Sequence, residues 1–275
     1  MISTIILIVN ILFILCFIIV LIAPGRSTCE MRAPFQNRNI AHRGLHTKDK
    51  KIPENSMAAF QAAIQAGYGI EFDIQLTKDE QIVIFHDDTL KRVCNIEGRV
   101  DDYTFKELQA FPLCNTKERI PLFSEFLSLV NGQVPLVVEL KNGRKNDLLC
   151  EKAYAMLKEY SGEFCIESFN PLIVAWFKRN APHILRGQLS APSKEFKGQV
   201  SRLQAFGLSH LLCNFVTRPH FISYHKEKRS LLVKLADRLG AMRVVWTVRD
   251  QDDIAAIEAR NDTVIFEFYH PPMKF

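Results

Sequence analysis

Eight short runs of strand-forming residues alternate with helix-like stretches along most of this chain of 275 residues. Two of the helix-like stretches, Met57–Ala66 before Gly67 and Asp147–Glu159 before Gly162, have the apolar spacing and glycine stop of amphipathic helices. A strand followed by a helix and another strand predicts a parallel βαβ unit, so this order predicts an α/β fold, a (β/α)8 TIM barrel. The eight predicted strands are Asn39–Ala41, Ile70–Ile74, Leu136–Leu140, Phe164–Glu167, Ile184–Gln188, His210–Asn214, Arg243–Val248 and Thr263–Phe266.

A ninth strand-like run, Ile82–Phe85, does not fit this alternation. Too few residues separate this run from the second strand for a parallel crossover, so we predict a β-hairpin inserted after the second strand. If Thr77 to Glu80 form the loop, Asp73 faces Ile84 and Glu71 faces His86 on a shared face. A slip of one residue would break this register.

The segment from Ile2 to Ala23 contains no charged residue. At about 1.5 Å per helical residue it is long enough to cross a hydrocarbon core of about 30 Å. A cleaved signal peptide needs a positive start, a shorter apolar stretch and a small-x-small cleavage site, so we predict a retained transmembrane helix. The predicted organisation is an anchor over residues 1–25, a juxtamembrane linker over 26–37 and a barrel over 38–275.

The charges that flank this segment predict its orientation. Arg26, Arg32 and Arg38 follow it closely, and Glu30 is the only acid among them. The positive-inside rule therefore predicts a single-pass membrane protein whose barrel is cytoplasmic. Seven scattered cysteines without short-spaced pairs agree with a reducing compartment. The net charge of +5 is small, and no basic stripe with interleaved aromatics predicts a nucleic acid partner.

Polar residues gather where the predicted strands end. The carboxyl ends of barrel strands converge on one mouth, where active sites are built. A lone strand-end His or a lone Glu/Lys pair is usually structural, but three acids buried together would be strongly unfavourable without a cation. Oxygen ligands at this density favour Mg2+ or Ca2+ over zinc, and two His with two cations suit phosphoryl chemistry. These residues are His42, Arg43, Glu71, Asp73, His86, Asp87, Glu139 and Lys141.

Short motifs at these positions follow one another in a characteristic order. They are Ala41-His42-Arg43-Gly44, Pro53-Glu54-Asn55-Ser56, Glu71-x-Asp73 with Thr77-Lys78-Asp79, Phe85-His86-Asp87, Glu139-Leu140-Lys141, Ser168-Phe169 and Trp246-Thr247-Val248. Over residues 39 to about 250, this order closely resembles the glycerophosphodiester phosphodiesterase family.

The resemblance implies a role for each matching residue. His42 and His86 would be the general acid and base, in an order that the sequence leaves open. Glu71, Asp73 and Glu139 would hold one divalent metal ion, while Arg43 and Lys141 would bind the phosphate. The implied reaction is metal-dependent hydrolysis of a glycerophosphodiester to an alcohol and glycerol 3-phosphate. The substrate's own hydroxyl is a candidate first nucleophile, through a cyclic phosphate.

The anchor favours a lipid-derived phosphodiester substrate, including lysophospholipids, because a tethered site works at the bilayer surface. Two alternatives remain open. One is a phosphodiester lyase that stops at the cyclic phosphate. The other is a non-catalytic, membrane-tethered binding protein on the same fold.

Other residues have two interpretations each. Trp246 either lines the mouth as an apolar wall or is a core aromatic. Glu54 and Asn55 either support the metal ligands or cap a helix. The histidines without a motif are expected to be structural: His46, His183, His210, His220, His225 and His270.

The last predicted strand departs from the family, in which it usually ends in Thr-Asp followed by Pro. Here Phe266-Glu267-Phe268 precedes Pro271. Glu267 is the candidate replacement for the aspartate. The bulky Phe266 is expected to reshape the side of the mouth that contacts the leaving alcohol.

Overall fold

A computed structural model describes residues 2–275 and shows an eight-stranded parallel barrel. Around the barrel the strands follow the order β1, β9, β8, β7, β6, β5, β4 and β2, and the β1–β2 pairing closes the ring. The predicted fold class is therefore confirmed. The barrel strands are β1 (Arg38–His42), β2 (Gly69–Leu76), β4 (Leu136–Leu140), β5 (Phe164–Ser168), β6 (Arg186–Ser190), β7 (Phe221–His225), β8 (Met242–Val248) and β9 (Thr263–Phe266).

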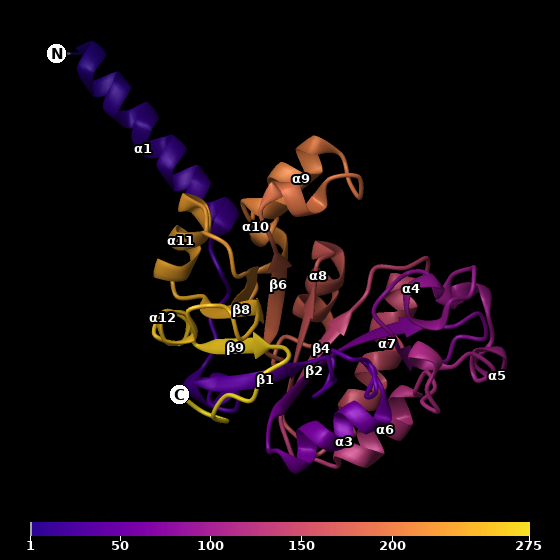
Figure 1. Cartoon of the computed structure of the whole chain (residues 1–275). Helices are drawn as coiled ribbons and strands as arrows, with labels where there is room; N and C mark the ends of the chain where they lie inside the picture. Colours follow the sequence, from indigo (N-terminus) through magenta and orange to yellow (C-terminus); the bar gives the residue numbers. More distant parts are fainter. Residues whose placement is uncertain (1) are drawn as a thin grey trace.

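Helices surround the barrel and cover the outer faces of its strands (Figure 1). The longer ones are α3 (Met57–Gln65), α6 (Phe123–Val130), α7 (Asn146–Leu157), α8 (Pro171–Asn180), α9 (Arg202–Ser209) and α11 (Leu231–Arg238). Shorter turns of helix are α2 (Cys29–Arg32), α4 (Lys91–Cys94), α5 (Phe105–Leu108), α10 (Asn214–Thr217), α12 (Ile254–Glu258), η1 (Val100–Asp102), η2 (Leu113–Asn115) and η3 (Ser193–Phe196).

The sixth barrel strand, β7, lies later in the chain than predicted. The run His210–Asn214 is not a strand: it forms a turn and the start of α10, with Leu211 at a positive φ of 60°. The strand is Phe221–His225, two residues after Pro219. Leu211 is buried against Ile222 of this strand, which explains why both segments are apolar.

The hairpin after β2 is present, but its predicted register is wrong by one residue. β3 (Ile82–Ile84) pairs antiparallel with β2 so that Leu76 faces Ile82. Thr77 and Gln81 close the turn, because the Thr77 N–H donates to the Gln81 carbonyl at 2.9 Å. The loop therefore has three residues and ends at Glu80 with a positive φ of 60°, as three-residue hairpin loops commonly do. As a result Glu71 does not face His86.

The hairpin begins a larger insertion with an apolar core of its own. From β3 to the start of α6, the chain passes through α4, η1, α5 and η2. Their buried side chains form a cluster separate from the barrel core, comprising Val83, Phe85, Leu90, Val93, Cys94, Val100, Leu108, Leu113 and Ile120. This insertion packs at the end of β2 and so forms one wall beside the mouth.

The N-terminal helix α1 (Ile2–Ile22) projects away from the barrel (Figure 1). Among the residues that the structure describes, its Thr4–Ile22 segment is the one helix long and apolar enough to cross a membrane. Its end is attached to the barrel, because Asn214 donates a hydrogen bond to the Ile22 carbonyl at 2.9 Å.

Candidate active site

The polar residues of the site lie on the inner face of the barrel because strand side chains alternate between two faces. Ile40 of β1 packs in the apolar core inside the barrel, and His42 follows two residues later on the same face. In β4, Val137 belongs to the same core, and Glu139 follows it in the same way. A layer of apolar side chains thus fills the barrel below the site.

Three buried carboxylates meet at this mouth. One oxygen each from Glu71, Asp73 and Glu139 lies within 4.8 Å of the others. Parallel pairing of β2 with β4 places Asp73 beside Glu139, and Glu71 lies two residues earlier on the same face. The structure therefore brings together the three acids that the sequence predicted as a cluster.

The electrostatics of this cluster favour a cation. Burial, followed by the carboxylates of Asp73 and Glu139, raises the pKa of Glu71 well above its usual value. Burial also raises the pKa of Glu139, although Lys141 opposes the shift. Burial would likewise raise the pKa of Asp73, but nearby positive charges, chiefly that of Lys141, outweigh it and lower that pKa. Like charges held this close in a buried site are stabilised by a divalent ion.

The turn after β1 brings Arg43 to the acids. Its backbone N–H donates to Glu71 Oε2 at 3.1 Å, and its guanidinium donates to Glu54 at 2.7 Å. The next residue must be glycine: Gly44 has a φ of +78°, and a Cβ there would lie 2.9 Å from the Ala59 backbone. The glycine of the His-Arg-Gly motif is therefore a steric requirement of this turn.

Glu54 and Asn55 support the site rather than cap the following helix. Asn55 donates to Asp73 Oδ2 at 2.8 Å, and Glu54 forms an ion pair with Arg43. Ser56 is the residue whose side chain caps α3. Of the two interpretations of Glu54 and Asn55, the supporting role is the one that the contacts favour.

His42 is held from one side by Glu267. Its Nδ1 lies 2.6 Å from Glu267 Oε1, while its Nε2 lies 3.7 Å from Glu71 Oε2. Burial, with a smaller contribution from Arg43, lowers the pKa of His42 to about 4, although Glu267 opposes this shift. A neutral imidazole that donates Nδ1–H to Glu267 keeps Nε2 as a proton acceptor facing the acids.

Glu267 has two further partners. It accepts hydrogen bonds from Arg249 at 2.8 and 3.0 Å, and it lies 3.5 Å from Nε2 of His46. His46, which we expected to be purely structural, is thus beside the site. Arg249, which follows the Trp246-Thr247-Val248 motif, was not predicted as a site residue.

Phe266 does not line the mouth, contrary to expectation. Its side chain is buried on the outer face of β9, with its ring 4.8 Å from Tyr68 and 5.3 Å from Tyr269, centroid to centroid. Alternation along the strand explains this, since Glu267 faces inward and its neighbour must face outward.

His86 lies in a bend just after β3 rather than within the hairpin ladder. Its Nδ1 is 2.6 Å from Asp87 Oδ1, and Asp87 is fixed in turn by Arg92 at 2.6 Å. The Phe85 N–H donates to the Asp73 carbonyl at 3.0 Å, so His86 follows directly on a residue that is paired with the acid cluster. The mouth therefore holds two imidazoles, each bonded to a carboxylate of its own.

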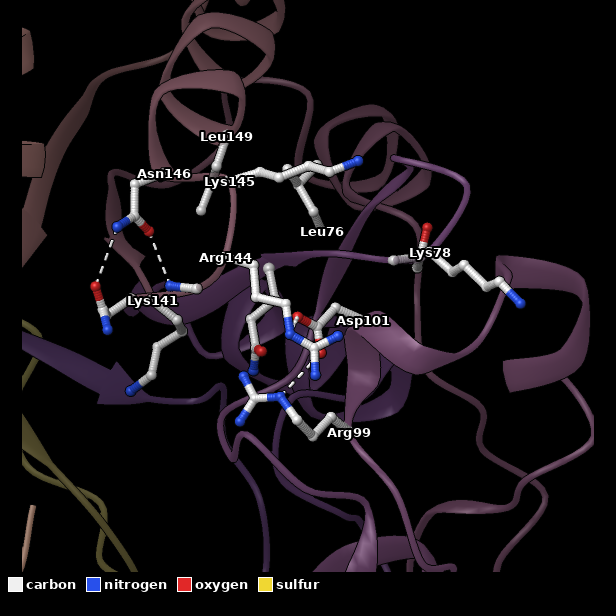
Figure 2. Close-up of a pocket in the computed structure, with 13 residues that line it drawn as sticks. Leu76, Lys78, Arg99, Asp101, Lys141, Arg144, Lys145, Asn146 and Leu149 are labelled. Carbon is white, nitrogen blue, oxygen red and sulfur yellow. Dashed lines mark hydrogen bonds and ion pairs between the residues drawn. The ribbon is translucent and has the colours of Figure 1, made fainter.

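Lys141 stands between the acids and a hollow in the surface. Its Nζ lies 2.8 Å from Glu139 and 3.3 Å from Asp73. Figure 2 shows this ammonium directed away from Arg144 and Lys145, which line the hollow on the other side. Most residues that line the hollow besides Lys141 have polar or charged side chains: Gln75, Thr77, Lys78, Arg99, Asp101, Asn142, Arg144, Lys145 and Asn146, with Leu76, Gly143 and Leu149.

Trp246 of β8 is half-buried among aromatic side chains. Its indole N–H donates to the Ser223 carbonyl at 3.1 Å, and its ring meets Phe169 edge to face at 5.7 Å. Phe169 follows β5 directly, so both rings lie on the side of the barrel formed by β5 to β8.

A fourth buried acid, Glu167, was not predicted from the sequence. It lies beside Glu139 in the pairing of β4 with β5, and burial and that carboxylate raise its pKa to about 8. Its Oε2 is buried without a hydrogen-bond partner among the described residues. Strand alternation from Cys165 could have revealed it, because Cys165 packs inside the barrel two residues before.

The matches with known proteins agree with this geometry. A family model described as the glycerophosphoryl diester phosphodiesterase family matches residues 42–269. The chain belongs to this family. It is therefore an enzyme, a glycerophosphodiester phosphodiesterase.

Individual relatives place the chain within the family. A glycerophosphodiester phosphodiesterase of Caldanaerobacter subterraneus subsp. tengcongensis is 33% identical over 239 residues, which is 82% of this chain and 92% of the relative. A lysophospholipase D, GDPD1 of Rattus norvegicus, is 34% identical over 143 residues, which is 47% of this chain and 43% of the relative.

Solved structures have the same fold. A phosphodiesterase of Oleispira antarctica in complex with the product sn-glycerol-3-phosphate superposes with a TM-score of 0.69 at 23% identity, over 86% of this chain and 94% of that one. A glycerophosphodiester phosphodiesterase of Thermotoga maritima gives a TM-score of 0.62 at 22% identity, over 83% and 93%.

Proposed function

We propose that this enzyme holds one divalent ion, Mg2+ or Ca2+, on Glu71, Asp73 and Glu139, and cleaves its diester with the help of His42 and His86. The observation that carries the proposal is the convergence of the three buried carboxylates within 4.8 Å. When bound, the ion would neutralise charge on the phosphoryl oxygens.

The residues present fit such an ion. Asp73 Oδ1 is buried and makes no hydrogen bond among the described residues, although Lys141 Nζ lies 3.3 Å from it. The set is made of carboxylates alone, the donors that Mg2+ and Ca2+ prefer. Without a cation, the raised pKa of Glu71 favours its protonated form, so metal and protons should compete for the site.

Arg43 and Lys141 would bind the phosphate. Both side chains are largely buried and lie against the acids. They are therefore already fixed in place before the substrate binds. Fixed positive charge at the reacting phosphorus stabilises the charge that builds on its equatorial oxygens as the nucleophile attacks.

The hydrogen bonds of the two imidazoles support different roles. His42 donating Nδ1–H to Glu267 would leave Nε2 to accept the proton of the nucleophile, which makes His42 the base. His86, held by Asp87, would then protonate the departing alkoxide. In net reaction one water is consumed: its oxygen ends on phosphorus and one of its protons on the alcohol.

The substrate's hydroxyl could attack before water does, which would give a cyclic phosphate as an intermediate. We propose complete hydrolysis because the relatives matched over most of their length are phosphodiesterases by name. A lyase would stop at the cyclic phosphate.

We also propose that α1 is a retained single-pass anchor, with the barrel in the cytoplasm. Its length and composition and the arginines Arg26, Arg32 and Arg38 support this. Anchoring would bring the site to acylated diesters at the bilayer, and the similarity to a lysophospholipase D favours lysophospholipids among the substrates. Trp246 and Phe169 would then provide an apolar wall for the glycerol or the acyl chain.

Phosphorus NMR of the products tests the chemistry. Detergent-solubilised full-length protein is incubated with glycerophosphocholine and with lysophosphatidylcholine, each with Mg2+, Ca2+ or EDTA. We expect glycerol 3-phosphate from the first and lysophosphatidic acid from the second, with neither in EDTA. A cyclic phosphate as the final product would make the enzyme a lyase.

Two variants distinguish loss of activity caused by damage to the metal site from loss caused by any substitution. Glu71→Gln should abolish turnover, whereas Glu151→Gln, on the exposed surface of α7, should leave it unchanged. Unchanged turnover in Glu71→Gln would refute the metal site. Release of choline from glycerophosphocholine alone, and never from the lysolipid, would refute the lipid substrate.

A further inference from the structure

We propose that the face formed by α9, α10 and α11 lies against the bilayer, with Leu203 and Phe206 of α9 among the lipid headgroups. We call these three helices the membrane face. The inference rests on the proposed anchoring by α1, and it goes beyond it by assigning a second, reversible membrane contact to the barrel itself.

The first observation is that α1 is attached to this face by short, specific contacts. Asn214 donates to the Ile22 carbonyl at 2.9 Å, and Arg218 donates to the Ala23 carbonyl at 2.9 Å. The Gly25 N–H donates to the Pro219 carbonyl at 2.9 Å. No free linker therefore separates the end of the span from the barrel, and the barrel is held close to the bilayer surface.

The attachment also fixes which side of the barrel faces the bilayer. The contacts of α1 with the barrel involve α10 and α11. Figure 1 shows α9, α10 and α11 gathered at the end of the molecule from which α1 projects, while α5 lies at the far end. A bilayer crossed by α1 would therefore meet the membrane face first.

The second observation is where exposed apolar side chains occur. Outside α1, the described residues expose eight large apolar side chains, and six of them fall between residues 200 and 239. On a surface that faces only water, large apolar side chains are not expected to be concentrated in one segment of the chain. The six are Val200, Leu203, Phe206, Phe215, Leu231 and Leu239.

Within α9 these residues give the helix a second apolar side. Ala205 and Ser209 are buried against the barrel, while Leu203 is 81% exposed and Phe206 is 49% exposed. Leu203 and Phe206 are three residues apart and so lie on one side of the helix. A surface helix normally turns a polar side outward, whereas helices that lie in a membrane interface present such a side to the lipid.

The third observation is charge. Residues 194–239 contain nine Lys and Arg against three Asp and Glu, a surplus larger than the +5 of the whole chain. Basic residues beside a transmembrane segment are attracted to anionic lipid headgroups. Charge and apolar exposure thus point to the same partner, an anionic bilayer surface.

The membrane face also leads to the active-site mouth. Ala205 and Leu208 of α9 pack in one cluster with Phe169 and Trp246. A lysolipid leaving the bilayer beside α9 would therefore reach the aromatic wall of the mouth without crossing open water. The contact would position the barrel for its lipid substrate.

Quenching of tryptophan fluorescence tests this contact in the full chain. Leu203→Trp is reconstituted in vesicles of phosphatidylcholine and phosphatidylglycerol brominated near the top of the acyl chains. Lys106→Trp, on exposed α5 at the far end, is the matched control. The parent protein contains Trp176 and Trp246, so its emission is subtracted from both.

We expect quenching of the added emission in Leu203→Trp and none in Lys106→Trp. Equal emission from both in brominated vesicles would overturn the proposal. Release of the parent protein from membranes by alkaline carbonate would also overturn it. Such release would show that α1 does not anchor the chain, and the membrane face would then not be held at the bilayer. Phe206→Trp repeats the measurement if Leu203→Trp does not fold.

Hydrolysis of soluble glycerophosphocholine in the same vesicles reports the proposed function separately, because that substrate needs no bilayer. Hydrolysis without quenching in Leu203→Trp would refute the membrane face and leave the proposed chemistry intact. Quenching in Leu203→Trp, with no hydrolysis of glycerophosphocholine by the parent protein, would support the membrane face and refute the proposed chemistry.

Discussion

His42 Nδ1 lies 2.6 Å from Glu267 Oε1, so the last strand of the barrel orients an imidazole carried by the first. Burial of this pair keeps its hydrogen bond out of competition with water. We therefore propose that Glu267 is a positioning residue that acts through His42.

Glu267→Gln tests that role. An amide can present its N–H to His42 and hold the wrong tautomer, so we expect kcat to fall by about 100-fold, the scale of a lost acid or base. The neutral amide also removes a charge that raises the pKa of His42. If His42 is the base, the acid limb of the pH–rate profile should therefore move to lower pH. An unshifted profile with full kcat would contradict the assignment.

Lys141→Met should reduce kcat/KM for glycerophosphocholine by about 100-fold or more, because a fixed charge at the phosphate is lost. The matched control is Lys145→Met. Lys145 lies on the far side of the hollow in Figure 2 and pairs with Glu80 at 2.7 Å. Steady-state kinetics should show the large loss in Lys141→Met alone, and similar losses in both variants would argue against a phosphate contact.

Phe72→Ala should destabilise the fold by about 3–5 kcal/mol, since it empties a fully buried site. Phe72 lies between Glu71 and Asp73 and faces outward, with its ring 4.3 Å from that of Phe126, centroid to centroid. Denaturant unfolding in detergent measures the loss. Phe215→Ala, at an exposed site, should change stability by about 0.5 kcal/mol or less.

Acid should weaken the fold through His220. Burial, followed by the charges of Arg186 and Arg32, lowers the pKa of His220 to about 3. The unfolded chain takes up the proton first, at about pH 6.5, so stability is complete above that pH and falls below it by up to about 1.4 kcal/mol per unit until about pH 3. His220→Gln should remove this part of the slope. Unfolding curves of the parent protein and of His220→Gln are compared at about pH 7.5 and 5.5. Equal loss of stability in the two proteins would disprove the role of His220.

Much of the fold could be predicted because alternation of strands and helices is a local property of the sequence. The sixth barrel strand, β7, could not be predicted, since His210–Asn214 and Phe221–His225 are strand-like runs of equal length. Tertiary packing decides between them: Leu211 is buried beneath Ile222, whereas the later run joins the sheet. Short apolar runs carry no periodicity that separates a strand from a buried turn.

The acid cluster could be predicted because it needs only alternation along β2 and parallel pairing with β4. The hairpin register depended instead on a single loop conformation, the left-handed Glu80, which a sequence of four polar residues does not specify. The expected partner of His86 followed from the wrong register, although the residue before it, Phe85, does bond to the backbone of Asp73. Contacts among residues far apart in the chain, such as that of Arg249 with Glu267, leave no local pattern.

Direct measurement of metal binding tests the central claim. Full-length protein is dialysed free of ions, and binding of Mg2+ and of Ca2+ is followed by titration calorimetry together with the recovery of glycerophosphocholine hydrolysis. We predict one ion per chain, recovery of activity in step with its binding, and loss of both in Glu71→Gln. Full activity in the metal-free protein, or unchanged binding in Glu71→Gln, would contradict a metal centre on Glu71, Asp73 and Glu139.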